Sequence, residues 1–115
     1  MATILVLVPD LMFSTRVEDS AKRLGYSVAS LGAREDFDAT MTREQPALVI
    51  VALDADNWQD AVAAAKRAGA RVLAFGSHRD VERMQAARAA GCDEVAARSR
   101  MASELPNLLK KYVGA

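Results

Sequence analysis

The sequence holds little of what builds disulfides, metal centres or membrane spans. Its one cysteine, Cys92, excludes an internal disulfide and a cysteine-based zinc site. Its one histidine, His78, excludes a metal site built from several histidines. The apolar runs at residues 4–9 and 47–53 are far shorter than the ~20 residues that span a bilayer, and no basic segment precedes the first of them as in a secretory signal. We therefore expect a cytoplasmic protein with no membrane partner.

An excess of charge of one sign is also lacking. Fifteen Lys and Arg residues balance fifteen Asp and Glu residues, so the formal net charge is zero. Because binding to a phosphate backbone needs a basic excess, we expect no nucleic-acid partner. The glycine motifs G-x-G-x-x-G and G-x-x-x-x-G-K-[ST] do not occur, and the sequence predicts no cofactor.

What the sequence does contain is a regular alternation of strand and helix patterns. Short apolar runs predict five strands, at residues 4–8, 26–31, 47–53, 72–75 and 94–97. Apolar residues at three- and four-residue spacing predict helices after them, at residues 11–24, 33–44, 58–68, 77–90 and 103–112. The fourth helix is expected to open with a capping box of the form S-x-x-D at Ser77 and Asp80, and to turn Val81 inward.

Five such units predict one α/β domain over residues 1–115. Strands separated by helices are parallel, and their crossovers are right-handed in nearly all proteins. The first, third and fourth runs are the most apolar and are expected to be central. The prediction is therefore a three-layer, flavodoxin-like (βα)5 sandwich with the parallel strand order 2-1-3-4-5. Ligands of such sheets bind beyond the carboxyl ends of the strands, here the predicted loops at residues 9–11, 54–57, 76–78 and 98–100.

Three short sequence motifs add to this pattern, namely LGY at residues 24–26, PALVIV at 46–51 and AGCDE at 90–94. Together with the order of the elements, they resemble the receiver domain of bacterial response regulators over nearly the whole chain. The resemblance implies two-component signal transduction by a CheY-like domain. It also implies a phosphorylation pocket at the carboxyl edge, whose residues in this chain can be compared one by one.

That comparison predicts a degenerate pocket. Receivers carry an acidic pair that holds magnesium, an acceptor aspartate, a hydroxyl residue, an aromatic switch residue and a lysine. The matching positions here hold Pro9 with Asp10, Ala52, Gly76 followed by Ser77, Val95, and Arg98. Since alanine has no oxygen to phosphorylate and one carboxylate is a poor magnesium site, we expect no metal and no enzymatic activity. Asp54 is the best rival acceptor, because it would keep the direction of the Ala52 side chain if the strand continued.

Other residues near this edge have a structural and a functional interpretation each. Trp58 begins a predicted helix, and its indole either covers the top of the core or anchors a partner or ligand. His78 is either simply exposed or acts as a general base or a phosphate contact. The backbone amides of Gly76 and Ser77 form an ordinary turn or cradle an anion.

A second candidate surface follows from the resemblance, because receivers commonly dimerise through their fourth helix, fifth strand and last helix. The charged residues expected there are Arg79, Arg83, Arg88, Asp93, Glu94, Glu104, Lys110 and Lys111. Their mixed charge suits a self-complementary two-fold interface, and a solvated surface with weak ion pairs is the alternative.

These observations predict a pseudo-receiver, a non-phosphorylatable receiver that acts in signalling or regulation by binding a protein partner or a second copy of itself. One alternative is a module that binds a small anionic or planar ligand. Another is an unconventional phosphorylated receiver that uses Asp54 or Asp10.

Overall fold

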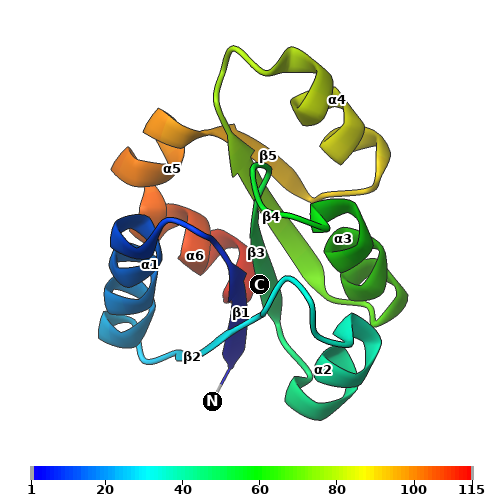
Figure 1. Cartoon of the computed structure of the whole chain (residues 1–115). Helices are drawn as coiled ribbons and strands as arrows, with labels where there is room; N and C mark the ends of the chain where they lie inside the picture. The colour runs from blue at the N-terminus through cyan, green and yellow to red at the C-terminus, as the bar shows by residue number, and fades with distance from the viewer. Residues whose placement is uncertain (1, 115) are drawn as a thin grey trace.

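The structure, a computed structural model, describes residues 2–114. Its centre is a five-stranded parallel sheet in the order β2-β1-β3-β4-β5, which confirms the predicted fold class (Figure 1). The strands are β1 (Thr3–Leu7), β2 (Ser27–Ser30), β3 (Leu48–Ala52), β4 (Arg71–Gly76) and β5 (Glu94–Ala97). Every residue of β3 is buried, as expected for the central strand of a sheet covered on both faces.

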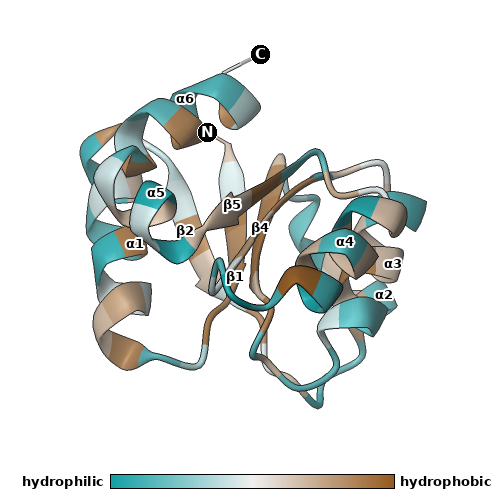
Figure 2. Cartoon of the chain, turned by 90° about the horizontal axis from the view of Figure 1, so that it is seen from above, coloured by the Kyte–Doolittle hydropathy of each residue, from teal (hydrophilic) through white to brown (hydrophobic). Residues whose placement is uncertain are grey.

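Helices cover both faces of the sheet and turn their apolar sides toward it (Figures 1 and 2). One layer contains α1 (Leu11–Arg23), α5 (Arg98–Ser103) and α6 (Leu105–Val113), and the other contains α2 (Phe37–Glu44), α3 (Trp58–Arg67) and α4 (Val81–Ala89). Each layer has its own apolar cluster, because alternate residues of every strand point to opposite faces. Within residues 2–114, no helix is long and apolar enough to cross a membrane.

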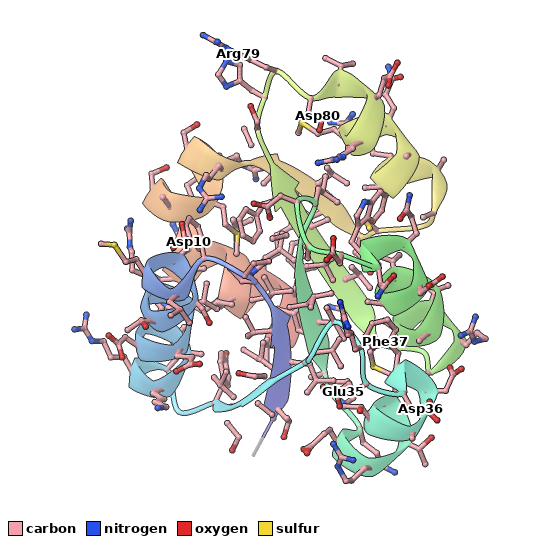
Figure 3. All side chains as sticks on the ribbon, viewed as in Figure 1. Asp10, Glu35, Asp36, Phe37, Arg79 and Asp80 are labelled. Carbon is pink, nitrogen blue, oxygen red and sulfur yellow. The ribbon has the colours of Figure 1, made fainter. Side chains whose placement is uncertain are left out.

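The helix α2 begins later than the predicted residue 33. Asp36 is its N-cap and accepts a hydrogen bond from the Ala39 N–H, while the Glu35 carboxylate accepts from the Gly32 N–H and the Thr40 hydroxyl. Acidic side chains here bind backbone donors, so residues 33–36 form a capping loop rather than a helical turn (Figure 3).

The predicted capping box before α4 is wrong. Asp80 is itself the N-cap and accepts from the Arg83 N–H at 3.1 Å, whereas the Ser77 hydroxyl accepts from the Arg79 N–H at 3.2 Å. The helix therefore starts three residues later than a Ser77 cap requires, and Val81 is its first residue, while Met84 and Ala87 point inward and are buried. Val81 is 55% exposed instead of buried.

The segment after β5 is also helical where a loop was predicted. Residues 98–103 form α5, which leads directly into α6, and Pro106 lies in the first turn of α6, where a missing N–H is tolerated. Arg98 is therefore the first residue of a helix at the carboxyl edge of the sheet. This places its side chain beside the start of α1.

Candidate functional site

The carboxyl ends of the strands meet at one edge, and most of the predicted site residues lie there. Asp10 follows β1, Asp54 follows β3, Ser77 follows β4 and Arg98 follows β5. Asp10 and Asp80 lie at this end of the molecule, at the starts of α1 and α4 (Figure 3). The structure thus brings these segments together as the topology requires.

The Asp10 carboxylate is fully engaged by groups of the chain itself. Its Oδ1 accepts hydrogen bonds from the N–H groups of Met12 and Phe13, at 3.0 and 3.2 Å, so Asp10 is the N-cap of α1. Its Oδ2 accepts from the Arg98 guanidinium at 2.7 Å. At the position where receivers hold a metal, this carboxylate caps a helix and pairs with a cation.

Arg98 is held in place by aromatic rings as well. Its guanidinium carbon lies 4.9 Å from the ring centre of Phe13 and 5.8 Å from that of Phe75. The two rings stack on each other at 4.8 Å with planes 19° apart. Sequence reasoning assigned both phenylalanines only to the core, since nothing in one chain's pattern shows that residues 13, 75 and 98 meet.

Ala52 ends β3 and is 1% exposed, with its methyl group in the same apolar cluster as Phe13 and Phe75. The chain turns immediately afterwards, because the Ala55 N–H donates to the Ala52 carbonyl at 3.0 Å. The expectation that Asp54 keeps the direction of an extended strand is therefore wrong. Leu53 is buried, and the Asp54 side chain is exposed in the turn.

Gly76 stands where receivers carry a hydroxyl residue, and it has little room for a side chain. A Cβ built there would lie 3.3 Å from both Cβ and Cδ1 of Leu53. A hydroxyl residue at position 76 would therefore require Leu53 to shift. Ser77, the next residue, is exposed on the loop toward α4.

A cleft of about 140 Å³ lies between the ends of β3 and β4 and the start of α4. It is lined by Leu53, Asp54, Phe75, Gly76, Ser77, Asp80, Arg83 and Arg98. Its two carboxylates face two guanidinium groups, and Asp80 pairs with Arg83 at 3.4 Å. In the part of the chain that the structure describes, no three His, Cys, Asp or Glu side chains gather to hold a metal ion. The two negative and two positive side chains of this lining therefore balance in charge without a metal ion.

A larger, open hollow of about 510 Å³ lies on the other side of Arg98, over α1 and α5. It is lined by Phe13, Arg16, Ser77, His78, Arg98, Ser99 and Ala102. Two arginines, a histidine and two hydroxyls face this space, and no carboxylate does. Arg16 and Ser99 were not among the predicted site residues, because the assignment of residues 98–100 to a loop concealed that α5 packs beside α1.

Trp58 belongs to the core rather than to this edge. It is 5% exposed and packs in the cluster beneath α2, α3 and α4, so of its two predicted roles the structure supports the core and not the contact for a ligand or partner. The preceding Asn57 caps no helix amide and donates its side-chain N–H to the Ala33 carbonyl at 2.7 Å. Val95 is half-buried against the same cluster as Trp58.

On the surface formed by α4, β5 and the last helices, the acidic residues Glu94 and Glu104 are already paired. Glu94 binds Arg100 at 2.9 Å, Lys111 at 3.7 Å and the Tyr112 hydroxyl at 2.6 Å, and the Glu104 carboxylate also binds Arg100, at 3.2 Å. The hydrogen bond from Tyr112, outweighing burial, and the guanidinium of Arg100 hold the pKa of Glu94 below its ordinary value. In return, burial and the bond to Glu94 raise the pKa of Tyr112 to about 12.

The Asp93 carboxylate lies at the opposite, amino end of the strands. Its Oδ2 accepts from the Val72 N–H at 2.7 Å and from the Lys66 ammonium at 2.9 Å. Burial alone would raise the pKa of Asp93, but these two donors outweigh it and keep the pKa below its ordinary value. Burial is also the main cause that raises the pKa of the neighbouring Cys92 thiol to about 11, so this thiol is a poor nucleophile.

Comparison with known proteins decides which fold this is. No family model matches the sequence, and the search of curated proteins finds no match. Solved structures do match. A receiver domain protein (CheY-like) from Methanospirillum hungatei JF-1 aligns with a TM-score of 0.83 at 18% identity, over 99% of this chain and 94% of that one. The chain has the receiver-domain fold.

Two further receiver-fold structures agree. A putative response regulator from Chloroflexus aurantiacus J-10-fl aligns with a TM-score of 0.81 at 16% identity, over 99% of this chain and 98% of that one. The chemotaxis protein CheY4 of Vibrio cholerae aligns with a TM-score of 0.80 at 17% identity, over 97% of this chain and 98% of that one. At these identities the likeness establishes the fold, and function must be argued from the residues of the site.

Proposed function

We propose that this receiver-fold chain accepts no phosphoryl group and acts in signalling or regulation as a protein-interaction module without catalytic activity. The observation that supports this most is the end of β3, where Ala52 places a buried methyl group at the position of the acceptor. Phosphoryl transfer needs a nucleophile and a metal that offsets the phosphate charge. Among residues 2–114, no three His, Cys, Asp or Glu side chains gather to hold such a metal, and the acceptor position holds a methyl group.

The contacts of Asp10 give independent support. Its carboxylate already accepts three donors, two backbone N–H groups and the Arg98 guanidinium. A magnesium ion would have to displace Arg98 and find further oxygen ligands. A structure similar to this one, a response regulator from Burkholderia pseudomallei, contains a phosphorylated aspartic acid and a calcium ion. In this chain, the cation bound to Asp10 is the Arg98 guanidinium.

The distribution of charge favours the surface of α4, β5 and α6 as the one that contacts a partner. On the α4-β5-α6 surface, Asp93, Glu94 and Glu104 are neutralised by cations of the same chain. Within the described residues, Arg88 and Lys110 form no ion pair. A partner that presents carboxylates would find these cations available, and a second copy of the chain is the first partner to test.

Intact mass spectrometry tests the loss of phosphorylation. The protein is incubated with magnesium and acetyl phosphate under conditions that phosphorylate a working receiver, which serves as the positive control. We expect no adduct of one phosphoryl group. An adduct that disappears in Asp54→Asn or in Asp10→Asn would overturn the proposal and identify that residue as an acceptor.

Sedimentation velocity over a range of protein concentrations tests the interaction surface. If the partner is a second copy, the wild-type chain dimerises, Arg88→Glu weakens the dimer, and the matched control Lys22→Glu on α1 does not. A wild-type chain that stays monomeric at high concentration would exclude the homodimer. Equal effects of both variants would exclude this surface.

A further inference from the structure

The open hollow over α1 and α5 has a lining suited to an anion. Every charged side chain that lines it is cationic, namely Arg16 and Arg98, and the remaining polar side chains are His78, Ser77 and Ser99. All of these can donate hydrogen bonds. A lining that combines several donors with no carboxylate disfavours cationic ligands and favours an oxyanion.

The donors of this lining are largely unused. Arg16 donates one hydrogen bond, to the Ala102 carbonyl at 3.2 Å, and forms no ion pair within residues 2–114. Since a guanidinium carries five N–H donors, most of those on Arg16 remain available. The Ser77 hydroxyl oxygen accepts from the Arg79 N–H, which leaves its own O–H free to donate.

Arg98 is held ready for such a ligand. The stacked rings of Phe13 and Phe75 support its guanidinium, and Asp10 fixes one of its nitrogens at 2.7 Å. A cation whose position is already fixed loses little conformational entropy when an anion binds. Asp10 uses one edge of this guanidinium, and Arg98 also borders the hollow.

The distribution of the donors and the size of the hollow narrow the ligand class. The donors come from three segments, the helix α1, the loop between β4 and α4, and the helix α5. Such an arrangement fits a tetrahedral phosphate with three terminal oxygens better than a planar carboxylate. A volume of about 510 Å³ is larger than a phosphate ion needs, and Phe13 and Ala102 add apolar surface.

We propose that this hollow binds a small organic phosphomonoester, with the phosphate between Arg16 and Arg98 and the organic group toward the apolar lining. The ligand is bound reversibly and is not transferred to the protein. This site is distinct from the acceptor position at Ala52 and does not depend on the absence of phosphorylation there.

A titration of the full chain followed by ¹H–¹⁵N NMR tests this proposal, with phenyl phosphate as the probe at physiological salt. We expect saturable shifts at the amides of Ser77, His78 and Ser99. Inorganic phosphate lacks the aromatic ring, and benzoate carries a carboxylate in place of the phosphate. Both are expected to bind more weakly than phenyl phosphate. Arg16→Gln should weaken phenyl phosphate binding by about tenfold, the effect of losing one charge-assisted contact.

Arg34→Gln is the matched control, because Arg34 is an exposed arginine outside this hollow and outside the α4-β5-α6 surface. It should leave the affinity unchanged. The proposal is overturned if phenyl phosphate gives no saturable shift, if benzoate binds more tightly than phenyl phosphate, or if Arg34→Gln weakens binding as much as Arg16→Gln. None of these results bears on the mass measurement above, so the two proposals can fail separately.

Discussion

The two ends of the sheet each carry a carboxylate paired with a cation, and they use the pair differently. At the amino end, Asp93 binds Lys66 of α3 and the backbone N–H of Val72 in β4. At the carboxyl end, Asp10 caps α1 and binds Arg98 of α5. The first pair joins elements to one another. The second also joins elements, but its cation borders both the small cleft and the open hollow.

This difference shows which of the two ion pairs has a cation positioned to meet a ligand. The Asp93 carboxylate satisfies a partly buried backbone donor, so its contribution is to stability. Asp10 and Arg98 are 45% and 40% exposed at the side chain, so their pair adds little stability and can exchange partners. Substitutions of the two carboxylates should therefore differ in how much unfolding free energy they remove and in which contact causes the loss.

The largest effect is expected from Ala52→Asp, which puts a carboxylate at a buried, apolar position of the carboxyl end. The methyl group of Ala52 is buried among apolar side chains, and an unpaired carboxylate there should cost about 2–4 kcal/mol of unfolding free energy. Urea denaturation measures it. The exposed neighbour Asp54→Ala is the control and should stay within about 0.5 kcal/mol of wild type. An Ala52→Asp variant as stable as wild type would mean that the position is open.

At the amino end, Asp93→Ala should lower the unfolding free energy by about 1–3 kcal/mol, because it leaves the Val72 N–H without its acceptor. Folding lowers the pKa of Asp93, so its contribution is present above the ordinary carboxyl pKa and is lost as the pH falls through the folded-state value. Wild type should therefore lose more stability than the variant on acidification below pH about 4. Parallel pH profiles of the two proteins would contradict this role.

A smaller effect is expected at Asp10, where two variants separate the two contacts. Asp10→Ala removes both the helix cap and the ion pair and should cost about 1 kcal/mol. Asp10→Asn keeps a good capping side chain and loses the charge, so it should cost less than about 0.5 kcal/mol. Thermal unfolding compares them. Equal losses would show that the ion pair, and not the cap, stabilises this end.

The smallest effect concerns Glu94, whose contacts connect β5 to α5 and α6. Glu94→Gln removes the charge beside the Tyr112 hydroxyl and should lower the pKa of Tyr112 from about 12 toward the ordinary tyrosine value. Because this pKa is raised by folding, the contact stabilises the protein below the ordinary tyrosine pKa and is lost as the pH rises toward about 12. Ultraviolet titration of the tyrosinate measures it, and an unchanged Tyr112 titration in the variant would exclude the contact.

The periodicity of the sequence was sufficient to predict the fold. Strands buried on both faces produce continuous apolar runs, which is why residues 47–53 could be recognised as a central strand and why the order β2-β1-β3-β4-β5 followed. The errors lie where local hydrogen bonds compete with the pattern. Asp80, and not Ser77, caps α4, and Glu35 and Asp36 bind backbone donors ahead of α2.

The candidate site could be predicted only in part. Topology predicts that residues following β1, β3, β4 and β5 lie at one edge, and Asp10, Asp54, Ser77 and Arg98 do. Which side chains pair across that edge is a property of packing between distant segments. The stacking of Arg98 on Phe13 and Phe75, and the contribution of Arg16 to the hollow, depend on α5, a helix too short to show a periodicity of its own.

The most direct test of the central claim is a ¹H–¹⁵N NMR titration with magnesium and beryllofluoride, which together mimic a phosphoryl group on an aspartate. If the carboxyl end is closed by Ala52 and by the Asp10–Arg98 pair, the amides of Leu53, Asp54 and Gly76 show no saturable change at millimolar concentrations. A new, saturated set of resonances for these amides, absent in Asp54→Asn, would show a working acceptor and contradict the account.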